Sequence, residues 1–269
     1  MPNNIYLVTI SFDCSNLLLP KKQEEILDLA WSFVAFLYKN GNILKHAELF
    51  NLDKTHLITY NVIPNKNALD DNFLDTFALK YRSELEAAGV IIHYNITGEY
   101  VNEGMLCLEK NIEDIKFFYL YPLYISDDEL ILRTDKGKYL PLYMIKNSEN
   151  PYLTEKITFW KNDYAAAGRL WLSSYKKLEP LIAKQLANLN SDISVEGRKV
   201  SEQIANHFNK KVFYPLAELW SSKKRKYTRS NYTQCPSCSK DWQLKKEFHN
   251  IFDFKCNKCS LLGYELSVI

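Results

Sequence analysis

Four cysteines near the C-terminus strongly limit how this part of the chain can fold. They form two C-x2-C pairs, Cys235 with Cys238 and Cys256 with Cys259, and seventeen residues separate the two pairs. Each pair can bend so that both sulfur atoms face one metal ion, and the residues between the pairs suffice for two antiparallel strands. The spacing therefore predicts one tetrahedral zinc ion held by four thiolates.

The predicted zinc is structural, because four thiolates leave the ion no open coordination position. Its binding would contribute on the order of 10 kcal/mol or more to the folding of a unit too small to bury a large core. Two alternatives remain at this point. His249 could replace a thiolate, although it lies between the pairs rather than in one, and the cysteines could instead form disulfides.

Composition indicates an ordinary globular protein, with 46% hydrophobic and 25% charged residues among 269. There is no apolar run of about 18 residues, so we expect no transmembrane helix and no membrane partner. The first residues, Met-Pro-Asn-Asn, do not resemble a secretory signal. We therefore expect a cytoplasmic protein, in which paired cysteines bind metal more often than they form disulfides. Cys14 and Cys107 are then expected to be small buried side chains.

Charge is distributed unevenly along the chain. Residues 1–220 contain 24 Lys and Arg against 28 Asp and Glu, whereas residues 221–269 contain 10 against 4. A mildly acidic body thus precedes a basic tail. Basic side chains bind phosphates with release of counterions, and aromatic side chains can stack on unpaired bases. The candidate nucleic-acid-binding residues are Lys223, Lys224, Arg225, Lys226, Arg229, Lys245 and Lys246.

Hydrophobic periodicity predicts an α+β protein. We expect strands over 5–12, 56–63 and 90–96, and helices from about 21 to 39 and over 69–88, which together form a sheet with helices against it. Residues 105–145 contain short apolar runs, and 135–138 resemble a hairpin turn between strands 130–134 and 139–143. The residues that follow Asn150-Pro151 are expected to be mostly helical up to about residue 209, with Asp192 or Ser194 capping the last helix.

The predicted domains follow from these patterns. Residues 1–146 form an α/β sheet domain with an antiparallel extension, and 150–220 form a helical region. Residues 221–233 form a basic linker, and 234–269 form the zinc ribbon, with strands near 241–244, 251–255 and 264–268. The oligomeric state is left open.

The C-terminal part resembles a bacterial family of zinc-ribbon proteins of unassigned function for which nucleic-acid binding has been suggested. The resemblance is most specific over residues 195–262, and it implies zinc and a nucleic-acid partner but no catalytic residues. Many such ribbons have glycine after the first cysteine pair, where this chain has Ser239. The matching segments are Glu196-Gly-Arg198, Val212-Phe-Tyr-Pro-Leu216, Cys235-Pro-Ser-Cys238, Trp242-Gln-Leu244 and Ile251-Phe-Asp-Phe-Lys-Cys-Asn-Lys-Cys259.

We expect a zinc-ribbon protein that binds DNA or RNA through its basic linker and ribbon. One alternative is an adaptor whose ribbon binds a protein partner. A further alternative is an enzyme whose site lies in the N-terminal domain, although no nucleotide-binding, G-x-S-x-G or H-E-x-x-H motif occurs. The acid–base groups available to such an enzyme are His93, Glu99, Glu103, Glu109 and the run Asp127-Asp128-Glu129.

Overall fold

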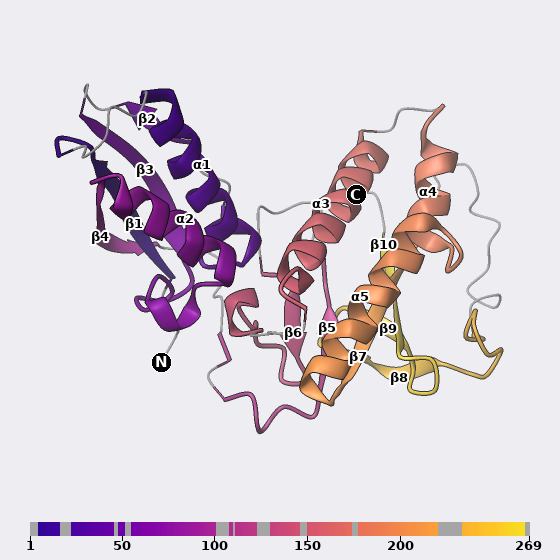
Figure 1. Cartoon of the computed structure of the whole chain (residues 1–269). Coiled ribbons are helices and arrows are strands. Elements are labelled where there is room, and N and C mark those ends of the chain that lie inside the picture. Colours follow the sequence, from indigo (N-terminus) through magenta and orange to yellow (C-terminus); the bar gives the residue numbers. More distant parts are fainter. Residues whose placement is uncertain are drawn as a thin grey trace. The chain divides into compact units, whose positions relative to one another are not determined.

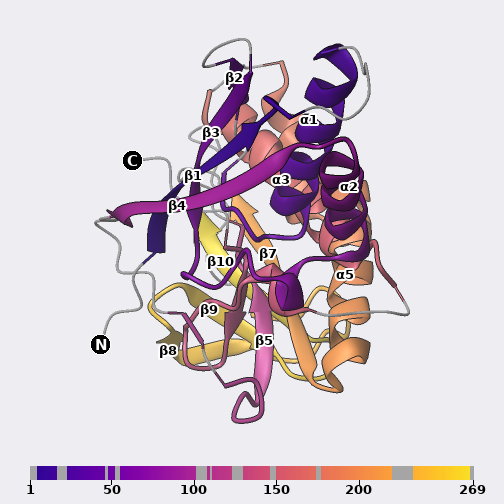
Figure 2. The same ribbon diagram turned by 60° about the vertical axis from the view of Figure 1, so that its left-hand side comes forward.

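The computed structural model describes ten stretches of the chain: residues 5–16, 23–45, 48–51, 55–100, 108–109, 111–122, 130–145, 150–173, 177–219 and 233–266. The chain forms two compact units, and each unit is assembled from several separate stretches (Figures 1 and 2). Residues 1–110, 128–130 and 138–155 belong to the first unit. Residues 111–127, 131–137 and 156–269 belong to the second unit.

The first unit is a four-stranded antiparallel sheet covered by two helices. In chain order it contains β1 (Ile5–Asp13), α1 (Gln23–Lys39), β2 (Phe50–Asn51), β3 (His56–Ile63), a 3-10 turn (Asp71–Phe73), α2 (Thr76–Ala87) and β4 (Ile91–Tyr100). The strands lie in the order β2-β3-β1-β4 and every neighbouring pair is antiparallel. This is the βαββαβ arrangement of ferredoxin-like domains.

Alternation along β1 explains which face of this sheet the helices cover. Val8, Ile10 and Phe12 are buried, and they pack with the apolar face of α1, including Phe33 and Leu37. In both views α1 and α2 lie on the same face of the sheet (Figures 1 and 2). The expected strands and the first helix are thus present.

The second helix begins later than its hydrophobic pattern predicts. Asp75 is extended and its side chain accepts a hydrogen bond from the backbone N–H of Ala78, which starts α2 at Thr76. An N-terminal cap satisfies a backbone donor that would otherwise lack a partner. Phe73 therefore lies in the preceding 3-10 turn rather than in the helix, although its ring still contacts Tyr143 in the first unit.

The second unit is built on a six-stranded sheet in the order β6-β5-β7-β10-β9-β8. Its strands are β5 (Phe117–Leu120), β6 (Leu132–Thr134), β7 (Lys211–Leu219), β8 (Gln243–Phe248), β9 (Phe252–Cys256) and β10 (Leu261–Leu266). The central strand β7 is parallel to both of its neighbours, β5 and β10, and the other pairs are antiparallel.

The expected hairpin over 130–143 does not form. Its turn is present, because Gly137 has φ of +76° and donates its N–H to the carbonyl of Thr134. However, β6 pairs with β5, while Tyr139 forms an isolated bridge with Leu108 and a 3-10 turn covers Leu142–Met144. The partner of β6 is therefore set by its pairing with the earlier strand β5 rather than by the turn that follows β6.

Three helices, α3 (Leu153–Leu172), α4 (Glu179–Ala187) and α5 (Asp192–Phe208), form the helical middle region. The cap of α5 is Ser191, not Asp192 or Ser194, and its side chain accepts a hydrogen bond from the N–H of Ser194. Left-handed Asn209 ends this helix just before β7. The structure therefore has the α+β organisation that we expected.

Within the described stretches, no helix combines the length and the apolar character that a membrane crossing requires.

Candidate metal centre

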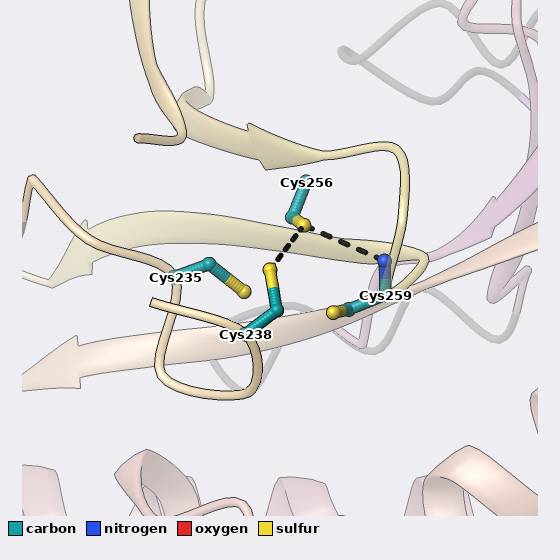
Figure 3. Close-up of side chains that lie close together, drawn as sticks. All are labelled: Cys235, Cys238, Cys256 and Cys259. Carbon is teal, nitrogen blue, oxygen red and sulfur yellow. Dashed lines mark hydrogen bonds between the residues drawn. The ribbon is translucent and has the colours of Figure 1, made fainter. Parts of the chain in front are cut away.

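The four cysteine side chains converge on one point (Figure 3). Cys235 and Cys238 come from the loop before β8, Cys256 ends β9, and Cys259 lies in the turn before β10. All four sulfur atoms lie within 4.8 Å of one another, and the sulfur atoms of Cys238 and Cys256 are 3.7 Å apart. Zinc–sulfur bonds of about 2.3 Å in a tetrahedron separate neighbouring sulfurs by about 3.8 Å. The arrangement thus fits a zinc ribbon.

A shared backbone geometry shapes the two cysteine pairs. The residue after each pair is left-handed: Ser239 has φ of 56° and Ser260 has φ of 54°. In the first pair the N–H of Ser239 donates a hydrogen bond to the carbonyl of Cys235. The N–H of Cys235 in turn donates a hydrogen bond to the carbonyl of Lys240. In the second pair the N–H of Cys259 points at the sulfur of Cys256, 3.4 Å away (Figure 3). Serine thus takes the conformation for which glycine is favoured.

The thiols of the first pair differ in acidity. Burial raises the pKa of the Cys235 thiol to about 12. A hydrogen bond from the backbone N–H of Lys240 lowers the pKa of the Cys238 thiol to about 7. The Cys238 thiol is therefore the more acidic of the two, and the field of a bound cation would favour ionisation of both.

The cysteine-bearing strands are integral to the sheet of the second unit. Strand β10 follows Cys259 directly and pairs in parallel with β7, so that Leu261 faces Tyr214 and Leu266 faces Leu219. The N–H of Tyr214 also bonds the carbonyl of Ser260, at the end of the second pair. The cysteine group thus directly precedes the strand that extends the central sheet.

Aromatic side chains fasten the ribbon to the strand β5. The ring of Phe252 packs edge-on against Tyr119 and Tyr121, with centroids 5.5 Å apart in both pairs. Phe248 also packs edge-on against Tyr119 at 5.6 Å, and its ring lies tilted against that of Phe117 at 5.8 Å. Such pairs contribute about 0.5–1.5 kcal/mol each beyond their buried area. The ribbon is therefore packed against its unit as well as hydrogen-bonded to it.

One ribbon lysine is used internally. The Lys255 ammonium lies 4.0, 4.6 and 4.8 Å from the ring centroids of Phe117, Phe213 and Phe248. Partial burial lowers its pKa. Cation–π contacts of this kind are worth up to about 2 kcal/mol when they are desolvated. Lys255 therefore joins β9 to β5 and β7 and is not an exposed phosphate ligand.

His249 is not part of the cysteine group. Its ring stacks on Tyr119 at 5.7 Å, and its Nε2 lies 3.1 Å from the carbonyl oxygen of Asp135. Burial lowers its pKa. Among the described residues, the group of side chains able to hold a metal consists of the four cysteines.

Two of the seven candidate nucleic-acid-binding residues are described. Lys245 and Lys246 are exposed on β8, the edge strand of the six-stranded sheet. The other five, Lys223, Lys224, Arg225, Lys226 and Arg229, lie outside the described residues. The described part of the ribbon carries nearly as many acidic as basic residues, so most of the excess positive charge belongs to the preceding segment.

The acid–base groups of the N-terminal part are not gathered in the described residues. His93 pairs with Ser11 and Glu99 with Tyr6 of β1, so a bulge between them places their side chains on opposite faces of β4, six residues or about 20 Å apart along the strand. Glu109 is buried and lies 3.4 Å from the ammonium of Lys138. Glu103 and the run 127–129 lie outside the described residues.

Comparison with known proteins finds two families of unknown function. Residues 224–265 match a family described as "Domain of unknown function (DUF8594)". Residues 112–216 match another, "Domain of unknown function (DUF2310)". The first match covers the ribbon, and the second extends from before β5 into β7. Each covers less than half of the chain.

Two bacterial relatives are similar to part of the chain. A Haemophilus influenzae protein titled "Uncharacterized protein" is 29% identical over 146 residues, which are 54% of this chain and 53% of the relative. A second protein of that organism, with the same title, is 27% identical over 150 residues, covering 54% of this chain and 68% of the relative. The chain thus spans about half the length of the first relative and about two thirds of the second.

A solved structure titled "Structural Genomics, protein YJCS" aligns with 36% of this chain and 99% of its own, at 13% identity and a TM-score of 0.28. A score this low carries no argument about fold or function.

Proposed function

We propose that the four cysteines bind one structural zinc ion, which secures a ribbon that binds nucleic acid. The observation that supports the metal is the convergence of four sulfur atoms at near-tetrahedral spacing. Zinc is the ion that four thiolates in this geometry favour. Its role is to hold β9 and β10 against the central strand β7 rather than to perform chemistry.

The nucleic-acid part of the proposal is supported by the cations around this site. Lys245 and Lys246 are exposed on the edge strand, and no ion pair joins them to another described residue. Five more cations occur within 223–229, a few residues before Cys235, in a stretch without a single acidic residue. Phosphates are the chemical group that such a set of cations attracts.

The metal is tested by measuring zinc in the purified full-length protein by mass spectrometry. We expect about one zinc ion per chain and its loss in Cys256→Ser, because removal of one thiolate opens the site. Cys14→Ser is the matched control and should keep its zinc, since Cys14 belongs to the first unit, outside the cysteine group. Unchanged zinc in Cys256→Ser would contradict the assignment.

The partner is tested by fluorescence anisotropy with labelled DNA and RNA strands at several salt concentrations. If all seven cations contact phosphates, the slope of log affinity against log salt is about −5 for single strands and about −6 for duplex DNA. Replacing Lys245 and Lys246 by Gln should reduce that slope by about 1.5. The control pair Lys80→Gln and Lys199→Gln, at exposed sites on α2 and α5, should leave it unchanged.

Salt-independent binding, or no binding at about 50 mM salt, would refute the nucleic-acid proposal. A protein partner that survives nuclease treatment and requires the same two lysines would favour the adaptor alternative.

A further inference from the structure

A hollow of about 280 Å³ lies beside the first cysteine pair, within the second unit. Its walls come from α4, β7, the loop between Gln234 and Trp242 that precedes β8, and the strands β9 and β10. The residues that shape it are Ala187, Ala217, Trp242, Phe254, Gly263 and Tyr264. The volume lies just below the usual range for small-molecule sites, so it suits one ring system rather than an extended ligand.

Small side chains on three elements keep the hollow open. Ala187 of α4, Ala217 of β7 and Gly263 of β10 each leave space where a larger side chain would fill it. Gly263 is also required for packing, since a Cβ there would lie 2.8 Å from Cη2 of Trp242 and 3.1 Å from Cβ of Phe254. The indole of Trp242 stacks on Phe254 with centroids 5.1 Å apart. The aromatic wall is thus held in one place.

The chemistry of the lining selects a neutral, flat group. Among the described residues, no Lys, Arg, His, Asp or Glu lines the hollow, whereas three aromatic side chains do. Two side chains of the lining, the amide of Gln234 and the hydroxyl of Ser239, belong to exposed residues and can form hydrogen bonds. An anion such as a phosphate would find no counter-charge inside, so the lining favours a ring with polar edges.

We infer that this hollow receives an unpaired base of a single-stranded nucleic acid, an inference that rests on the proposed nucleic-acid function. A cation that would hold a phosphate adjoins it along the chain. Lys240 follows Ser239 directly and is exposed. Single-strand binding proteins combine these two elements, cations for the backbone and aromatic surfaces for the bases.

The test compares two twelve-nucleotide strands of equal charge, oligodeoxythymidine and an abasic strand that has the same backbone but lacks bases. Anisotropy is measured with the zinc-loaded full-length protein. The base contact predicts that the abasic strand binds about 5- to 100-fold more weakly, while the salt slope stays the same because the phosphates are unchanged.

A hollow-filling variant gives the second arm. Ala187→Phe should weaken oligodeoxythymidine about 5-fold or more and leave binding of the abasic strand unchanged. Ala183→Phe is the matched control, since it makes the same substitution on α4 at a residue that does not line the hollow. Zinc content and circular dichroism show whether each variant is folded, and where Ala187→Phe is not, the comparison of the two strands decides.

The outcomes separate the two proposals. Equal binding of both strands, with a steep salt slope, overturns the base site and leaves the nucleic-acid function standing. Binding to neither strand at low salt overturns both. Weaker binding of the abasic strand, together with selective loss in Ala187→Phe, supports the base site.

Discussion

Replacing Gly197 by Ala should destabilise the second unit, although helix propensity alone predicts the opposite. Gly197 lies within α5, where Ala is favoured over Gly by about 1 kcal/mol. A Cβ at this position would lie 2.5 Å from Cε2 and Nε1 of Trp160, and closer still to Cε2 of Tyr214. The glycine of the Glu-Gly-Arg segment therefore lets α5 approach α3 and β7 closely.

Neither ring can move aside freely. Trp160 donates its indole N–H to the carbonyl of Ile193 at 2.9 Å, and the hydroxyl of Tyr214 donates to that of Ser194 at 3.2 Å. Overpacking costs about 1–3 kcal/mol, and the loss of one of these hydrogen bonds adds about 0.5–1.5. After the gain in helix propensity, the net loss in the free energy of unfolding is about 0.5–3.5 kcal/mol.

Urea denaturation of the zinc-loaded protein, followed by circular dichroism and tryptophan fluorescence, measures this loss. Gly98→Ala is the control, because a Cβ there meets nothing within 4 Å, and its effect should stay within about 0.5 kcal/mol. Trp160→Phe removes the nearest indole atoms, so Gly197→Ala should cost less in that background. A Gly197→Ala protein as stable as the parent would refute this account of the close approach.

Three further predictions concern single side chains. Ser239→Gly should be more stable than Ser239→Ala by about 1 kcal/mol in urea denaturation, because the backbone of Ser239 is left-handed. At Lys258, whose φ is not positive, Lys258→Ala should instead be more stable than Lys258→Gly. Asp75→Ala should cost about 1 kcal/mol by removing the cap of α2, whereas Asp75→Asn should keep the cap. Burial raises the folded-state pKa of Asp75 above its unfolded value of about 3.9. The free energy of unfolding should therefore fall as the pH rises from about 3.9 through the folded-state pKa, and Asp75→Asn should lack this pH dependence. Lys210→Met should cost about 2 kcal/mol, because the ammonium donates hydrogen bonds to the carbonyls of Ile112, Glu113 and Ile115, and an unchanged urea midpoint would contradict that role.

The sequence predicted elements whose signal is local. The alternation of β1, the periodicity of α1 and the spacing of the four cysteines each depend on residues close together along the chain, and the structure contains both elements and the cysteine group. The late start of α2 was missed because a cap at Asp75 overrides a continuous apolar stripe. The partner of β6 was missed because the turn at Gly137 fixes a reversal of the chain but not the strand that pairs next to it.

The parallel pairing of β7 with β10 could not be predicted from local pattern. A signal for β7 was present, since Val212-Phe-Tyr-Pro-Leu216 is a nearly continuous apolar run of the kind found in strands buried on both faces. The identity of its neighbours depends on residues about 45 and 95 positions away. The group of four cysteines was thus predictable from its spacing, whereas its place in the sheet was not.

The interleaving of the two units along the chain has a consequence for any attempt to isolate the ribbon. A fragment that begins at residue 156 would contain β7 and the four cysteines but not β5 and β6. It would therefore expose one edge of β7 and the aromatic surface of Phe252, both of which invite aggregation. A fragment ending at residue 110 would lack Tyr143, which belongs to the core of the first unit. Truncation of this chain from either end therefore removes parts of both units. A shortened version that still folds must keep residues 111–155, where the chain passes back and forth between the two units.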